Sequence, residues 1–184
     1  MKKTLLRVDY HIDRQDRIAY VNPEWNNFAR ENDAGYLAGK TVIGTPLWNY
    51  ISNVDTVRIY KKIVAKVRAE KAPVMIPYRC DSPRKRRYME MTVLSDGNSH
   101  VEFRNELVRE VDRAPIPLLD SNIPRTKGIL FMCGWCKKVK MPAGWTETSE
   151  AVEMLDLLNK PVLPQISHIL CNDCKKQLEK RFLM

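Results

Sequence analysis

The sequence predicts an α+β protein: a five-stranded antiparallel sheet with helices on one face, followed by a small C-terminal unit whose two ends are held together by a bound metal ion. Three observations support this prediction. Two strand-like segments precede a helical region, three strand-like segments follow it, and two Cys-x-x-Cys pairs lie near the C-terminus. We therefore expect a first domain over residues 1–110, a proline-containing linker over 111–128 and a metal-binding unit over 129–184.

The N-terminal third contains two short strands and a helix. Residues 4–8 are apolar enough for a short strand or helix, and residues 10–22 read as two strands around a polar turn. A helix is expected from Pro23, with Asn22 as its N-cap. Its apolar face consists of Trp25, Phe28 and Ala29.

The middle of the chain contains a long helix and three strands. A glycine-punctuated loop at 39–51 leads into a short helical turn. A longer helix is expected over 55–69, because its apolar residues recur at helical spacing. Strands are expected at 73–80, 88–94 and 100–108, and residues 95–98 form the turn between the last two.

The segments Asp-Arg-Ile-Ala-Tyr-Val-Asn-Pro-Glu-Trp (16–25) and Val-Ile-Gly-Thr-Pro-Leu-Trp (42–48), with the element order around them, resemble a PAS domain over residues 5–110. A narrower likeness is to bacterial PAS-containing proteins, carried by residues 79–87, Met132–Lys137 and Ser167–Cys174. Members of that group often have glycine after the histidine, where this chain has Ile169.

The C-terminal segment carries the clearest chemical signal. The pairs Cys133-Gly-Trp-Cys136 and Cys171-Asn-Asp-Cys174 supply the four soft ligands of a closed tetrahedral site, and zinc is the expected metal. Lysines follow each pair and favour thiolate over thiol. An iron–sulfur cluster, a redox dithiol and four unrelated buried cysteines are the alternatives.

Two further features of this segment bear on the site. His168, three residues before Cys171, is an alternative ligand in place of one cysteine, or orients a ligand from outside the site. The thirty-four residues between the pairs exceed the usual spacing of about twenty. We expect a short amphipathic helix at 149–158 within this insert, in a unit too short to bury a full core alone.

The composition indicates a basic protein of a reducing compartment. The formal net charge is +9, and it is spread along the chain except for the run Arg84–Arg87, which we expect to be a solvated loop. No apolar run is long enough for a membrane span and the N-terminus does not resemble a signal peptide, so a cytoplasmic location is expected. Five cysteines then favour metal binding or thiols over disulfides.

The sequence does not predict an enzyme, because it contains no P-loop, GxGxxG, GxSxG or HExxH motif. The PAS resemblance implies either a small ligand between sheet and helices or a docking module without ligand. Trp25, Trp48 and Tyr60 are candidates to line such a pocket, with ordinary core packing as the alternative. Cys80 is expected to be a buried apolar thiol.

The leading hypothesis is a non-catalytic PAS-type sensor or interaction protein in bacterial signal transduction, whose zinc unit docks on a partner. The partner is expected to be another signalling protein, and a homodimer is the default assembly. One alternative is a nucleic-acid-binding regulator that uses the cysteine unit and basic residues. The acidic insert helix, with Glu147, Glu150, Glu153 and Asp156, argues against that alternative. The other is a redox sensor that loses metal on oxidation.

Overall fold

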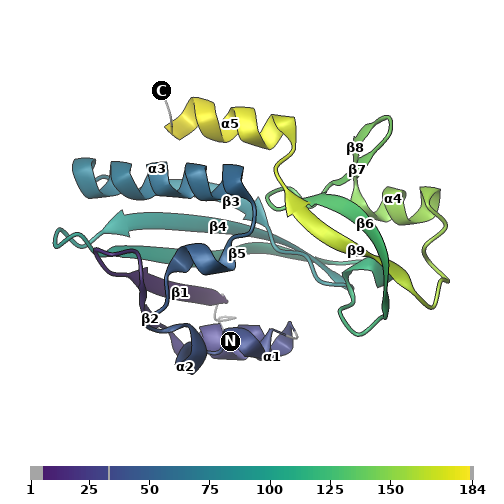
Figure 1. Ribbon diagram of the computed structural model, residues 1–184, viewed down its shortest axis with the longest axis horizontal. Coiled ribbons are helices and arrows are strands. Elements are labelled where there is room, and N and C mark those ends of the chain that lie inside the picture. Colours follow the sequence, from purple (N-terminus) through teal and green to yellow (C-terminus); the bar gives the residue numbers. More distant parts are fainter. Residues whose placement is uncertain (1–5, 33, 183–184) are drawn as a thin grey trace. The chain divides into compact units, whose positions relative to one another are not determined.

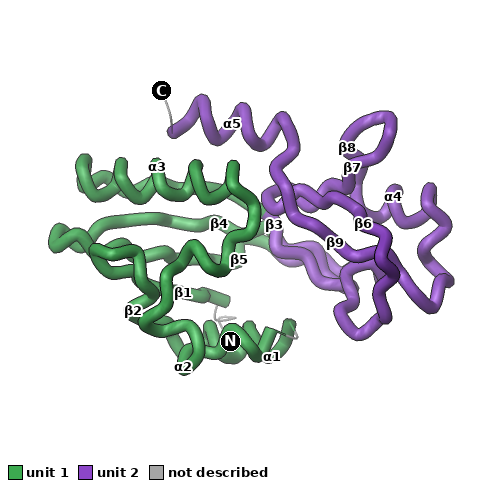
Figure 2. The backbone as a smooth tube through the Cα atoms, viewed as in Figure 1, with its two compact units in different colours: residues 1–78, 88–109 green, residues 79–87, 110–184 purple. Residues whose placement is uncertain are grey.

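A computed structural model describes residues 6–32 and 34–182, and these form two compact units. Unit 1 comprises residues 1–78 and 88–109, and unit 2 comprises residues 79–87 and 110–184 (Figure 2). The chain therefore passes between the units three times, and the hairpin 79–87 belongs with the C-terminal residues. Most of the segment expected at 4–8 lies outside the described residues or joins the first strand.

A five-stranded antiparallel sheet is the centre of unit 1, in the order β2-β1-β5-β4-β3 (Figure 1). This confirms the predicted fold class. The strands are β1 Arg7–Ile12, β2 Ile18–Val21, β3 Val74–Arg79, β4 Lys85–Ser95 and β5 Val101–Asp112. The turn between β1 and β2 is closed by the Asp13 carboxylate, which accepts hydrogen bonds from the backbone N–H groups of Gln15 (2.8 Å) and Arg17 (2.9 Å).

The helical segment of unit 1 lies between β2 and β3. It contains α1 Pro23–Glu31, η1 Gly35–Leu37, α2 Gly39–Val42, η2 Leu47–Tyr50 and α3 Val54–Glu70. Asn22 caps α1 as predicted, because its side-chain oxygen accepts a hydrogen bond from the Trp25 N–H at 3.0 Å. Asn53 caps α3 in the same way through Thr56 N–H, at 2.9 Å.

Helices α1 and α3 lie against the same face of the sheet. Tyr10 of β1 and Phe103 of β5 occupy paired positions and stack, with ring centroids 4.5 Å apart. Trp25 of α1 meets the Tyr10 ring edge-on at 5.4 Å, and Tyr60 of α3 lies 6.2 Å from the Phe103 ring. One face of the sheet is therefore packed and the alternate residues form the other face.

Unit 2 contains a second sheet, in the order β8-β7-β6-β9 (Figure 1). Its elements are η3 Pro117–Leu119, β6 Arg125–Cys133, β7 Val139–Met141, β8 Gly144–Thr146, α4 Thr148–Met154, β9 Leu163–Ile169 and α5 Asn172–Phe182. Strands β6 and β9 are parallel, whereas β7 pairs antiparallel with both β6 and β8. None of these strands appeared in the interpretation of the sequence.

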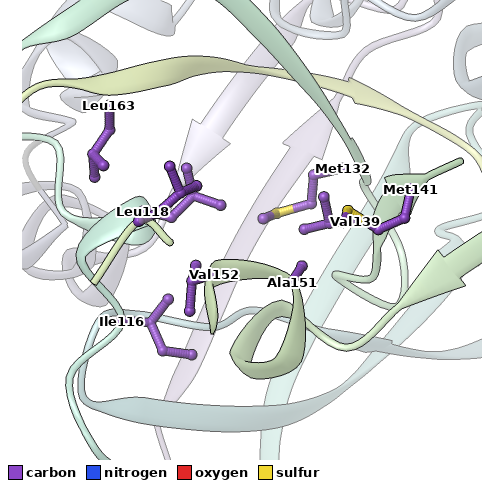
Figure 3. Close-up of a cluster of buried hydrophobic side chains, with 9 residues drawn as sticks. Ile116, Leu118, Met132, Val139, Met141, Ala151, Val152 and Leu163 are labelled. Atoms are coloured by element: carbon purple, nitrogen blue, oxygen red, sulfur yellow. The ribbon is translucent and has the colours of Figure 1, made fainter. Parts of the chain in front are cut away.

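Unit 2 has its own hydrophobic core, which the sequence interpretation did not foresee (Figure 3). Met132 and Val139 of the sheet pack with Ala151 and Val152 of α4. The buried cluster consists of Ile116, Leu118, Met132, Val139, Met141, Ala151, Val152, Leu157 and Leu163. Two of these residues, Ile116 and Leu118, come from the stretch expected to be an extended linker.

Helix α4 is shorter than the helix expected at 149–158. It ends at Met154, and Asp156 then adopts the left-handed conformation with φ of 50°. The Leu157 N–H donates a hydrogen bond to the Val152 carbonyl at 2.8 Å, and the Leu157 side chain is part of the core. Within the described part of the chain, no helix has both the length and the apolar character needed to cross a membrane.

Candidate metal centre

The four predicted cysteines come together where two parallel strands end. Cys133 is the last residue of β6, and Cys171 lies two residues after the end of β9, immediately before α5. The two strands are in register at this end, because Cys133 is paired with Ile169. Parallel strands need a crossover of a dozen or more residues. The long spacing between the pairs is therefore that crossover, formed by β7, β8 and α4.

The cysteine sulfur atoms are close enough to hold one metal ion. All four Sγ atoms lie within 4.8 Å of one another, and the Sγ atoms of Cys136 and Cys171 are 3.8 Å apart. In a tetrahedron with zinc–sulfur distances of about 2.3 Å, neighbouring sulfurs are about 3.8 Å apart. The cluster thus has close to the dimensions of a tetrahedral thiolate site. Cys133 and Cys171 are its most buried members.

Backbone hydrogen bonds hold the two cysteine pairs in place. The Cys133 N–H donates to the Lys138 carbonyl at 2.7 Å, and Lys137 takes the left-handed conformation with φ of 63°. The Gly134 N–H donates to the Ile169 carbonyl at 2.8 Å, which joins the first pair to β9. Backbone N–H groups also reach sulfur: that of Cys171 lies 3.4 Å from Cys133 Sγ. Such donors stabilise a thiolate.

The cysteines also change one another's pKa. Hydrogen bonds from Cys136 and Cys174 hold the pKa of the Cys133 thiol well below its usual range. The hydrogen bond to Cys133 raises the pKa of Cys136 to about 11, and the same neighbour raises the pKa of Cys174. Cys133 therefore ionises readily, and its hydrogen bonds and negative charge oppose ionisation of Cys136 and Cys174. A divalent cation among the sulfurs would remove this opposition.

His168 is outside the cluster of four sulfurs. It lies on β9 in register with Met132, is exposed, and its ring nitrogens are not among the atoms that lie within 4.8 Å of one another. The geometry therefore favours four cysteine ligands. The His168 side chain lies beside the turn of the first pair, because a Cβ built on Gly134 would be 4.0 Å from the His168 Cβ.

A network of charged side chains in unit 2 adjoins the first cysteine pair. Asp81 accepts hydrogen bonds from Arg79 and from Arg113 Nη1 (3.1 Å), and its side chain is 0% exposed. Glu147 accepts from Arg79 Nη1 at 2.8 Å and from Arg86 Nη2 at 3.0 Å.

This network is tied directly to the turn that carries the first cysteine pair. The Arg79 N–H donates to the carbonyl of Trp135, which lies between Cys133 and Cys136, at 2.8 Å.

The basic run Arg84–Arg87 was predicted to be a solvated loop, and this is wrong for three of its four residues. Lys85 begins β4 and pairs with Glu110, Arg87 Nε donates to Glu110 at 2.9 Å, and Arg86 pairs with Glu147. The acidic partners of these three cations are Glu110 and Glu147, which lie far from the run in the sequence. Nothing in the sequence shows that these partners lie close together.

The three aromatic candidates for a ligand pocket are only partly brought together. Trp25 and Tyr60 meet the same Tyr10–Phe103 stack. Trp48 is held elsewhere, by a 3.0 Å hydrogen bond from its Nε1 to Asp16. Burial raises the pKa of the Tyr60 hydroxyl above its usual value.

Cys80 follows β3 and is half-buried, and burial raises the pKa of its thiol.

Comparisons with known proteins found a likeness to solved structures. No protein-family model matches the chain, and no curated protein matches it. Solved structures do match. One is the crystal structure of a sensory box sensor histidine kinase from Vibrio cholerae, with 9% sequence identity and a TM-score of 0.38. The match covers 57% of this chain and 81% of that one.

Proposed function

We propose that this chain is a non-catalytic PAS-type sensory or protein-interaction module of bacterial signal transduction, with a structural zinc ion held by Cys133, Cys136, Cys171 and Cys174. One observation carries the proposal. The four cysteine sulfurs lie within 4.8 Å of one another where two parallel strands end. The α+β fold of unit 1, with helices on one packed face of its sheet, supports the PAS part of the proposal.

A structural role follows from the ligand count. Four cysteine ligands complete a tetrahedral zinc site and leave no open position for a substrate or an activated water. The site closes a crossover and joins β6 to the start of α5, so its binding energy contributes to folding of unit 2. An iron–sulfur cluster places several irons and sulfides between the cysteines and needs wider sulfur separations than one ion does.

The sensory part of the proposal concerns the packed face of unit 1. There Trp25 and Tyr60 would line a ligand pocket beside the Tyr10–Phe103 stack, or would form the core of a docking module that binds no ligand. In either case the proposed role is to pass a signal to another protein; no P-loop, GxGxxG, GxSxG or HExxH motif occurs in the given sequence.

Metal analysis of the purified full chain tests the proposal. Without added metal during purification, we expect about one zinc per chain and no visible absorption band. Cys136→Ala and Cys171→Ala should each lose the zinc and destabilise unit 2. Cys80→Ala is the matched control, because Cys80 is the one cysteine of this chain outside the cluster, and it should retain the zinc. Full zinc content in both cluster variants, or a coloured iron protein, would contradict the proposal.

A further inference from the structure

The sheet of unit 2 has one covered face and one uncovered face. Met132 and Val139 are paired, and both point into the core, together with Leu130 and Ile166. The alternate residues of β6, β7 and β9 therefore point to the opposite side. We call this the open face, and it comprises Ile129, Phe131, Lys140, Trp145, Gln165 and Ser167.

The strand register aligns four of these residues in one row across the sheet. Phe131 is paired with Ser167 on β9, and Lys140 is paired with Trp145 on β8. Because Met132 is paired with Val139, the antiparallel register places Lys140 opposite Phe131. The row therefore reads Ser167, Phe131, Lys140, Trp145. Neighbouring strands are about 4.8 Å apart, so the two aromatic residues are about 10 Å apart with a lysine between them.

Large apolar side chains on the open face reach solvent. Phe131 is 41% exposed and Ile129 is 56% exposed. Trp145 is partly exposed and Lys140 is exposed. Exposed aromatic residues on a regular sheet face are a ready surface for stacking planar groups.

Lys140 is the charged residue among the six that define the open face. None of the four described strands contains an aspartate or a glutamate. The acidic residues Glu150 and Glu153 lie on α4, whose Ala151 and Val152 pack into the core on the other side of the sheet (Figure 3). Glu150 and Glu153, which argue against nucleic-acid binding in the sequence, are therefore not on the open face, whereas Glu147 lies between β8 and α4 and pairs with Arg79 and Arg86.

We propose that the open face of unit 2 binds single-stranded nucleic acid, with Phe131 and Trp145 stacking on bases and Lys140 contacting a phosphate between them. Single-strand binders combine aromatic platforms with basic residues along a groove or sheet. The aromatic, cationic, aromatic order of the row matches the alternation of bases and phosphates in a strand. An acidic protein surface would satisfy Lys140, but it does not carry a planar base next to every negative charge as a nucleotide strand does.

Fluorescence anisotropy with a labelled single-stranded 12-mer, at several salt concentrations, tests this proposal. We expect the zinc-loaded wild-type chain to bind it more tightly than a duplex of the same length, with an affinity that falls as salt rises. Phe131→Ala should weaken binding about tenfold, within the range for loss of one stacked base. Lys140→Glu should weaken binding and lower the salt slope by about 0.7 or more.

Matched controls separate this site from general charge attraction. Lys160→Glu makes the same charge change at an exposed position outside the four strands, and Tyr36→Ala removes a 72% exposed aromatic residue of unit 1. Both should bind almost as wild type. Quenching of tryptophan fluorescence by the 12-mer should be reduced in Trp145→Phe. Zinc content and circular dichroism establish that each variant is folded.

Three results would overturn the proposal. The first is no binding to the 12-mer even at low salt, and the second is equal weakening by Lys140→Glu and Lys160→Glu. The third is tighter binding to duplex or to an acidic peptide than to the single strand. None of these results bears on the zinc site, because metal content is measured separately on the same samples.

Discussion

Replacing Asp81 with asparagine tests whether the ion-pair network is what holds the hairpin 79–87 in unit 2. Asparagine keeps the shape of the side chain but removes its charge, and it directs amide hydrogens toward the guanidinium groups of Arg79 and Arg113. Those two side chains are 10% and 12% exposed, and Asp81 is fully covered. The two arginines would then lose a buried counter-charge and keep their desolvation cost.

The expected loss of stability can be estimated from this geometry. Removing one partner of a buried ion pair costs about 3–5 kcal/mol. Arg79 retains its bonds to Glu147, so we place Asp81→Asn near the lower end, at about 3 kcal/mol. For a domain of this size, 1 kcal/mol corresponds to about 4–8 °C in Tm, so the unit 2 transition should fall by about 12 °C or more.

Scanning calorimetry of zinc-loaded protein measures this difference, with Glu70→Gln as the control. Glu70 pairs with Lys66 at 3.5 Å on a helix surface and is 53% exposed, so its replacement should cost no more than about 0.5 kcal/mol. If Asp81→Asn destabilised the protein no more than Glu70→Gln, the ion pairs of Asp81 would make no net contribution to the stability of unit 2.

Two further substitutions test other parts of unit 2. Hydrogen bonds from Lys85 and Arg87 lower the pKa of Glu110 below its ordinary value of 4.5. Wild type should therefore be more stable than Glu110→Gln, with the full difference in unfolding free energy present above about pH 4.5. The difference should disappear as the pH falls through the lowered pKa of Glu110. Urea unfolding midpoints measured across a pH series test this. Leu118→Ala should cost about 2–5 kcal/mol in urea unfolding, because Leu118 is 1% exposed. Leu158→Ala, at a 43% exposed position, should cost far less, and similar costs for both would show that residue 118 is not in a core.

The first unit could be predicted from local signals in the sequence. Asn22 and Pro23 mark a helix start by their own chemistry, and the alternation around Met91 and Phe103 gives the strands their faces. The strands β4 and β5 extend past their predicted ends, because ladder hydrogen bonding continues where the apolar alternation stops. Predicting those ends required knowledge of the partner strands.

The second unit could not be predicted in the same way. Strands β7 and β8 have only three residues each, which is too short for a periodic pattern. The pairing of β6 with β9 is parallel and spans a long crossover, so no turn between them signals it. The cysteine spacing pointed to a shared site without indicating that β6 and β9 run side by side.

The basic run and the proline-containing stretch show a second limit. Arg86 looks like a solvent-exposed cation until Glu147, sixty-one positions away, is placed 3.0 Å from it. Prolines at 115 and 117 suggest an extended connector, yet Ile116 between them is 3% exposed. Composition describes what a residue prefers on average, whereas burial depends on which distant residues meet it.

The membership of residues 79–87 in unit 2 limits how this protein can be divided. A fragment that begins after residue 110 would carry all four cysteines but lack Arg79 and Asp81. It would leave Glu147 and Arg113 without those buried partners and the Trp135 carbonyl without its donor. The C-terminal segment is therefore not a tail that can be grafted onto another protein. Residues 79–87 belong to the same compact unit as residues 110–184. A gene fusion made at the proline-containing stretch would therefore separate two parts of one unit.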